Sequence, residues 1–176
     1  MHAAEVQRAR RYRGMALFLA QGVAVSALSA WLVVALLGRY EFAIDPQMRK
    51  CLPNANLMVV DRAVRNLARG QVIAFNTDLS REPLMAPHSI AAKIIIGVPG
   101  DHIKVSPVET TVNGVVVGLG LADAKKAHLD VKQLTRELVI PPGFYWLMGE
   151  SGDSYDSRYW GPVPAGDFVG DVHVLF

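Results

Sequence analysis

The sequence has a single cysteine, Cys51, so no disulfide bond can form within one chain. It also lacks an excess of charge: the formal net charge is +2, and the basic residues form no long stripe of the kind that follows a phosphate backbone. Nucleic-acid binding is therefore not expected. Neither a metal nor an organic cofactor is implied. Four histidines are candidate zinc ligands, but they lack the close spacing of a zinc site: His88, His102, His128 and His173.

Hydrophobic residues make up 51% of the chain, and much of the excess lies near the N-terminus. The segment from Met15 to Gly38 has no charged residue, and about 20 apolar residues suffice to cross a bilayer core. Arginines are concentrated just before this segment, whereas only Arg39 follows closely. The positive-inside rule therefore predicts a cytoplasmic basic tail (1–14), a membrane anchor (15–38) and an outer domain (39–176). A cleaved secretory signal is the alternative, but its apolar core is usually only about 7–15 residues long.

The outer domain is predicted to be mainly β, because it consists largely of short segments rich in Val, Ile and Phe. We expect strands over residues 57–60, 71–75, 91–97, 103–105, 110–117, 137–140, 144–149 and 168–176. Asn113-Gly114 predicts a hairpin with a type I′ turn, which needs positive φ at both central residues. Only residues 119–136 look helical, and we expect them to form an insertion between strands. Its charged residues are expected on a solvated face: Asp123, Lys125, Lys126 and Lys132.

Three segments resemble signal peptidase I and its relatives, in the order and spacing of that family. Residues 69–75 (RGQVIAF) resemble a family strand that opens with Gly-Asp. Residues 92–103 (AKIIIGVPGDHI) are similar to the Lys-Arg-Val-Val-Gly-Leu-Pro-Gly-Asp block that carries the catalytic lysine. Residues 149–164 (GESGDSYDSRYWGPVP) resemble the Gly-Asp-Asn…Ser-x-Asp-Ser-Arg-Tyr-x-Gly-x-Val block. The resemblance covers residues 45–176 and implies a signal-peptidase-like antiparallel β-sheet domain, placed in the periplasm and anchored in the bacterial inner membrane.

Lys93 occupies the position of the catalytic lysine in this resemblance. An ammonium group within an Ile-rich strand is poorly solvated, which favours the neutral amine that a general base requires. The resemblance implies that Ser154 holds this amine through its hydroxyl, and that Asp156 and Arg158 form a salt bridge that braces the loop. The alternatives are a lysine that extends its ammonium to solvent and an ordinary polar turn.

The nucleophile is where the sequence departs from the family, which places a serine before Met ahead of the first strand. Residues 42–53 contain neither Ser nor Thr. Alignment on Met puts Gln47 at the serine position, and glutamine cannot attack an amide. Alignment on Leu-Pro puts Cys51 there, as in the conjugation branch of the family, the TraF-type peptidases that process pilin precursors.

A thiolate is strongly nucleophilic and is favoured by a neighbouring lysine, so Cys51 suits the role of nucleophile. The alternative is that Cys51 is a small buried hydrophobic residue, which is the usual fate of a free cysteine. The family's side-chain oxyanion donor, a serine, corresponds to Arg49. The oxyanion hole is therefore expected to depend on the backbone amide of Cys51.

The resemblance thus implies a membrane-anchored endopeptidase with a Cys51–Lys93 dyad, supported by Ser154, Asp156 and Arg158. Its expected partners are the lipid bilayer and a membrane-inserted precursor, most specifically a pilin subunit of a conjugative type IV secretion system. A thioester intermediate would favour transfer to an amine, so cyclisation of the product is conceivable. Three alternatives stay open at this point: a general type I signal peptidase, a catalytically inactive scaffold of the secretion apparatus, and a self-cleaving repressor.

Overall fold

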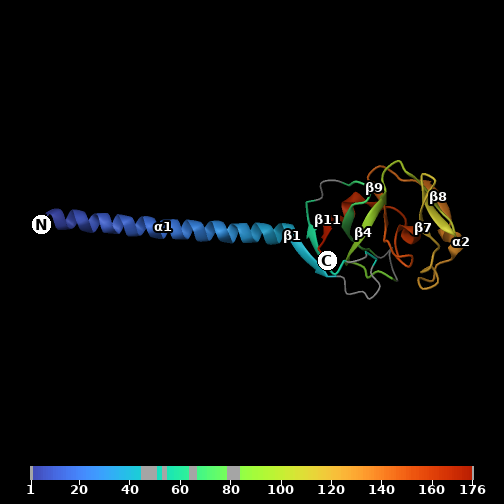
Figure 1. The fold of residues 1–176 in the computed structure, drawn as a ribbon, viewed down its shortest axis with the longest axis horizontal. Coiled ribbons are helices and arrows are strands. Elements are labelled where there is room, and N and C mark those ends of the chain that lie inside the picture. Colours follow the sequence, from blue (N-terminus) through green and yellow to red (C-terminus); the bar gives the residue numbers. More distant parts are fainter. Residues whose placement is uncertain (1, 45–50, 53–54, 64–66, 79–83, 176) are drawn as a thin grey trace. The chain divides into compact units, whose positions relative to one another are not determined.

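The computed structural model describes residues 2–44, 51–52, 55–63, 67–78 and 84–175, which form two compact units that divide after Arg39 (Figure 1). The first unit is a single helix, α1 (His2–Arg39). Its stretch Arg10–Arg39 has a mean hydropathy of 2.0 in its most apolar window and is long enough to cross a membrane. The predicted apolar helix is therefore confirmed, and it begins before the first residue expected for the anchor.

The second unit consists of two antiparallel sheets. The larger sheet has the strand order β1-β2-β11-β3-β4-β9-β10, and the smaller sheet has the order β7-β6-β5-β8. The strands of the larger sheet are β1 (Tyr40–Ile44), β2 (Leu57–Asp61), β11 (Phe168–Val174), β3 (Val72–Asn76), β4 (Ile90–Gly97), β9 (Phe144–Met148) and β10 (Val163–Pro164). Those of the smaller sheet are β7 (Val115–Leu119), β6 (Glu109–Val112), β5 (His102–Val105) and β8 (Arg136–Val139).

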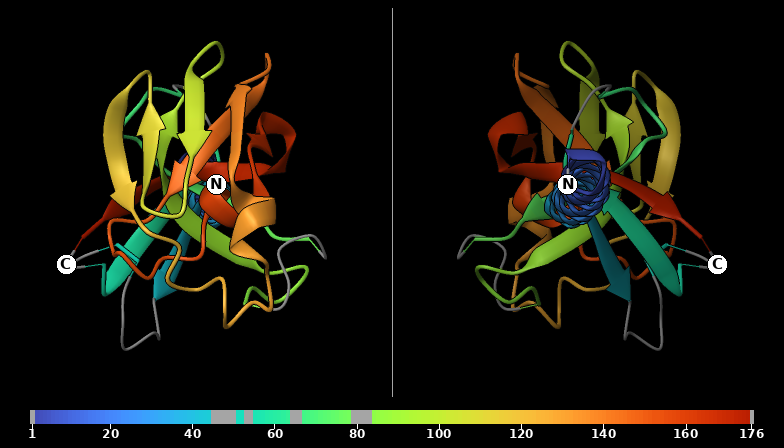
Figure 2. Two further views of the ribbon diagram at one scale, coloured as in Figure 1. Left: turned by 90° about the vertical axis from the view of Figure 1, so that its right-hand side faces the viewer. Right: turned by 90° about the vertical axis from the view of Figure 1, so that its left-hand side faces the viewer.

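The predicted mainly β fold is confirmed, although β1 and β10 were not among the expected strands. Within the domain, β1 lies at one end, and β7 and β8 of the smaller sheet lie toward the other (Figures 1 and 2). The predicted hairpin turn is also confirmed, because φ is 51° at Asn113 and 80° at Gly114. The Asn113 side chain accepts a hydrogen bond from the His102 amide and donates one to Asp101, which ties the turn to the segment that follows β4.

The prediction of a helical insertion over residues 119–136 is wrong for most of that segment. Residue 119 ends β7 and residue 136 begins β8, and between them only α2 (Val131–Leu134) is helical. Gly120 and His128 have φ values of 63° and 57°, and such left-handed residues interrupt a right-handed helix. Asp123, expected on a solvated face, is only 4% exposed, and its amide donates a hydrogen bond to the hydroxyl of Tyr159.

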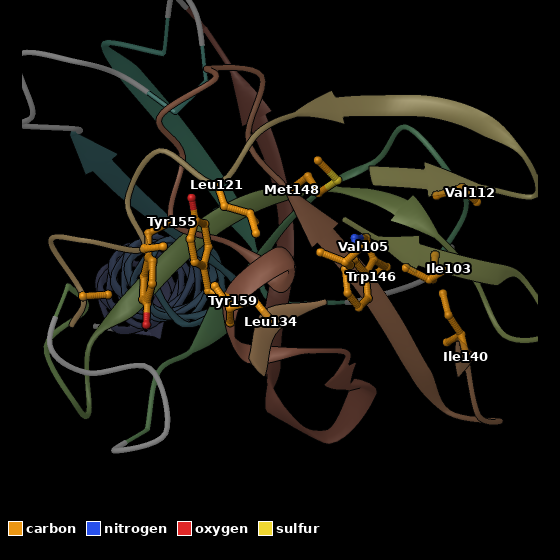
Figure 3. Packing of buried hydrophobic residues seen from close by; sticks show 12 residues of the cluster. Ile103, Val105, Val112, Leu121, Leu134, Ile140, Trp146, Met148, Tyr155 and Tyr159 are labelled. Carbon is orange, nitrogen blue, oxygen red and sulfur yellow. The ribbon is translucent and has the colours of Figure 1, made fainter. Parts of the chain in front are cut away.

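The largest of the hydrophobic clusters packs the smaller sheet against the segment between β7 and β8 and against the segment that follows β9. Trp146 and Ile103 are fully buried in it, and Tyr155 and Tyr159 lie beside each other with ring centroids 4.9 Å apart (Figure 3). The segment that holds Tyr155 and Tyr159 is therefore fixed by core packing, which positions the polar residues between them.

Candidate active site

Lys93 lies in the middle of β4, where it is opposite Ile73 of β3, and the pairing of β4 with β9 begins at the next residue, Ile94. Side chains alternate between the two faces of a strand, and Lys93 shares the more buried face with Ile95. Only 3% of Lys93 is exposed, and its Nζ donates a hydrogen bond of 2.9 Å to the Oγ of Ser154, which is itself fully buried. A buried amine with one N–H engaged in this way has a defined orientation.

Asp156 and Arg158 form a buried ion pair directly after Ser154 in the sequence. The guanidinium donates to both carboxylate oxygens, with Nε–Oδ1 2.8 Å and Nη2–Oδ2 2.9 Å, and Nη2 also donates to the carbonyl of Ser154. Burial alone would lower the pKa of Arg158, but the hydrogen bond and charge of Asp156 outweigh it and raise this pKa above its ordinary value. Arg158 therefore stays charged, and its hydrogen bonds to Asp156 and to the carbonyl of Ser154 hold the backbone of Ser154 in place.

Cys51 is half-buried and is tied to the same loop. The amide of Glu150 donates a hydrogen bond of 2.8 Å to the carbonyl of Cys51. The loop that begins at Gly149 thus contacts Cys51 through its first residues and Lys93 through Ser154. A single short segment therefore positions both residues of the predicted dyad.

Two cavities of about 270 Å³ each have both Cys51 and Lys93 in their walls. The first is a mainly apolar cleft lined by strands of the larger sheet, including Met58, Val60 and Ala74. The second is lined by charged and polar side chains of the loops together with the apolar Leu84 and Met85. The predicted nucleophile and base thus lie where the two cavities share a wall, whereas Gln47 and Arg49 lie outside the described residues.

A long match along the chain now identifies the family. The family model described as signal peptidase, peptidase S26, matches residues 15–176. The chain belongs to the signal peptidase S26 family. This membership agrees with the mainly antiparallel β domain and the N-terminal apolar helix, and it confirms the resemblance inferred from the three sequence segments.

The similar proteins include signal peptidases and a conjugal transfer protein. Probable signal peptidase I-2 of Synechocystis sp. is 32% identical over 115 residues, 64% of this chain and 50% of that protein. The conjugal transfer protein TraF of Agrobacterium fabrum is 27% identical over 84 residues, 48% of this chain and 47% of that protein. The chain thus spans about half the length of these relatives. A crystal structure of a signal peptidase I from Enterococcus faecalis aligns with a TM-score of 0.40 and 25% identity, covering 62% of this chain and 98% of that chain.

Gly149 is a residue of this candidate site that sequence reasoning did not single out. A Cβ atom at Gly149 would lie 2.4 Å from the Oγ of Ser154 and 3.0 Å from the carbonyl oxygen of Cys51. No side chain fits between these groups, so only glycine permits their approach. The sequence signal was its place at the start of the third segment, but a glycine after a strand is equally typical of an ordinary turn.

Ser157 was also missed. It is fully buried, and its hydroxyl accepts a hydrogen bond of 2.9 Å from the amide of Leu147. This bond ties α3 (Ser157–Trp160) to β9. The sequence gives no indication of it, because the contact depends on how the chain folds back.

Ser154→Ala is expected to slow precursor processing by roughly 10-fold to 1000-fold without abolishing it, because one hydrogen bond that orients the Lys93 amine is lost. The melting temperature should change little. Cleavage rates measured beside Ser106→Ala, whose hydroxyl hydrogen-bonds within the β5–β6 turn, separate this effect from a general loss of hydroxyl contacts. Wild-type cleavage by Ser154→Ala would contradict a role for this contact.

Asp156→Asn is expected to slow processing and also to destabilise the domain. Removing one partner of a buried ion pair costs about 3 kcal/mol or more, which corresponds to a loss of roughly 10 °C in Tm. Calorimetry should distinguish the Asp156→Asn variant from Glu137→Gln, which removes a carboxylate from an exposed pair with His102. Glu137→Gln should lower the free energy of unfolding by less than about 1 kcal/mol. Equal Tm values for the two variants would show that the Asp156–Arg158 pair does not brace the loop.

Proposed function

We propose that the protein is a membrane-anchored endopeptidase in which Cys51 is the nucleophile and Lys93 the general base. The observation that carries the proposal is that Lys93, almost fully buried and hydrogen-bonded to Ser154, lines the same two cavities as Cys51. Membership of the S26 family supports a peptidase. A catalytically inactive scaffold would instead predict a Cys51 that is buried away from Lys93.

The chemistry proposed for this arrangement follows from the groups present. The Lys93 amine uses one N–H to bond Ser154 and presents its lone pair to the Cys51 thiol, whose proton it accepts. The sulfur attacks the carbonyl carbon of the scissile bond, and the Cys51 backbone amide stabilises the resulting oxyanion. Collapse of the tetrahedral intermediate gives a thioester, and the leaving amine takes the proton from Lys93. Water or a second amine then cleaves the thioester.

We propose exported precursors, and among them pilin subunits of a conjugative type IV secretion system, as the substrate. The TraF relative supports this choice, as does the Cys51-Leu52-Pro53 sequence. The signal peptidase I relative favours a general preprotein peptidase as the second candidate. The two candidates share their chemistry and differ in the range of precursors accepted.

We further propose that residues 15–38 are the anchor in the bacterial inner membrane, with residues 1–14 in the cytoplasm and the domain 39–176 in the periplasm. The apolar span within α1 and the arginines that precede its apolar segment support this orientation. The lipid bilayer is thus a partner, and the precursor reaches the site from the same membrane.

The substrate proposal is tested by incubating the full chain in lipid nanodiscs with two precursors, a conjugative prepilin and a general secretory preprotein. We expect cleavage of the prepilin and little or no cleavage of the preprotein. Equal cleavage of both would favour the general signal peptidase. Cleavage of neither by a folded protein would contradict the peptidase.

A further inference from the structure

The two cavities that share Cys51 and Lys93 differ in the chemistry of their walls. Among the described residues that line the first cavity, Lys93 is the only charged one. The second cavity adds Asp123, Lys126 and Asp153 to the shared residues, together with the hydroxyl-bearing Tyr155. A peptide that occupies both cavities therefore meets no charged side chain besides Lys93 in the first and three further charged side chains in the second.

Apart from Lys93, which both cavities share, the second cavity has two carboxylates, Asp123 and Asp153, and one ammonium, that of Lys126. The Asp123 side chain is 6% exposed, whereas Lys126, which pairs with it at 2.5 Å, has a side chain that is 63% exposed. A buried carboxylate on a backbone fixed through Tyr159 keeps its place, whereas the ammonium of Lys126 lies at the end of a long, exposed side chain. Burial together with the charges of Tyr159 and Asp123 raises the pKa of Tyr155, so this phenol stays protonated at neutral pH.

A membrane-inserted precursor has the same asymmetry as the two cavities. Its apolar segment lies on one side of the scissile bond and its hydrophilic part on the other. The apolar cleft suits residues next to the membrane segment, and the second cavity suits residues beyond the bond. Asp123 and Lys126 belong to the β7–β8 insertion, so this insertion supplies part of the wall of the second cavity.

We propose that the second cavity is a substrate subsite for the hydrophilic part of the precursor, next to the scissile bond, and that Asp123 and Asp153 make it prefer a basic residue to an acidic one. A substrate cation replaces Lys126 as the partner of Asp123. This inference rests on the proposed peptidase function.

The test uses three synthetic peptides that share an apolar half rich in Ala and Val and carry Lys, Gln or Glu residues in a polar half. Their binding is measured by fluorescence anisotropy on the full-length Cys51→Ala variant in nanodiscs, and their cleavage on the wild type. We expect the Lys peptide to bind about 10-fold more tightly than the Glu peptide, because opposite charges attract and like charges repel at a partly buried site.

Three further variants locate the source of the preference for Lys over Glu. Each is made both in the wild type, for cleavage, and in Cys51→Ala, for binding. Asp153→Asn and Asp123→Asn should each reduce it, and Asp153→Asn keeps the test valid if the buried Asp123 proves necessary for folding. Lys126→Gln should increase it, because the competing cation is removed. Lys125→Gln is the matched control, since Lys125 is an exposed neighbour that does not line the cavity.

Equal binding of the three peptides, or a preference that both aspartate variants leave intact, would overturn the subsite. If the wild type cleaves the peptides with no charge preference, the subsite fails and the peptidase stands. If charge-dependent binding is present but no peptide is cleaved, the subsite stands and the peptidase fails.

Discussion

The Lys93→Met variant is expected to lose precursor processing, with a rate at least about 1000-fold below wild type, because the group that accepts the thiol proton is gone. Methionine has a similar length and volume and suits a site that is 3% exposed, so the domain should stay folded. It also removes a poorly solvated amine, and the melting temperature should be unchanged or higher. Processing of a membrane-inserted precursor and calorimetry of the same preparation measure both effects.

Lys104→Met is the matched control for this variant. Lys104 lies on β5 of the smaller sheet and is exposed, so its loss should leave processing at the wild-type rate. Normal maturation by Lys93→Met would remove the lysine from the mechanism. Equal impairment by both variants would point to a general loss of positive charge.

The second large effect is expected at Cys51. Cys51→Ala should abolish processing, because no other group is proposed to attack the scissile carbonyl, and it should leave the fold intact because Cys51 is only half-buried. Cys51→Ser should keep some activity but less than wild type. A serine hydroxyl is harder to deprotonate and depends more heavily on a neutral lysine and on a complete oxyanion hole.

The comparison of the two Cys51 variants decides what the thiol does. Wild-type cleavage by Cys51→Ala would show that the nucleophile is elsewhere. Cleavage by Cys51→Ser at the full wild-type rate would show that a hydroxyl serves equally well, and sulfur would then have no special part in the mechanism.

Much of the domain could be predicted from local sequence patterns. Short Val- and Ile-rich segments predicted most of the strands, because strands of this kind are recognisable from neighbouring residues alone. The Asn113-Gly114 turn was predicted for a physical reason, the tolerance of positive φ, and the structure has that geometry. The resemblance of the third segment to the family block implied that Ser154 holds the Lys93 amine, and the two side chains are hydrogen-bonded.

The features that escaped prediction depend on tertiary contacts. The insertion looked helical from composition, but its path is determined by the buried Asp123, whose amide donates a hydrogen bond to Tyr159, and by the left-handed residues Gly120 and His128. The close approach of Gly149 to Ser154 likewise joins groups that only the folded chain brings together. The charged second cavity combines residues from several loops, and no local pattern indicates such an arrangement.

The pairing of Cys51 with Lys93 is tested most directly by the rate at which iodoacetamide alkylates the folded protein. Cys51 is the only cysteine in the sequence, so the mass increase of the intact chain measures the alkylation of this one thiol. A lysine that accepts the thiol proton increases the thiolate fraction, and only the thiolate reacts. We expect alkylation at pH 7 to be at least about 10-fold faster in the wild type than in Lys93→Met, with equal rates for the two proteins in denaturant. Equal rates in the folded proteins would contradict the dyad.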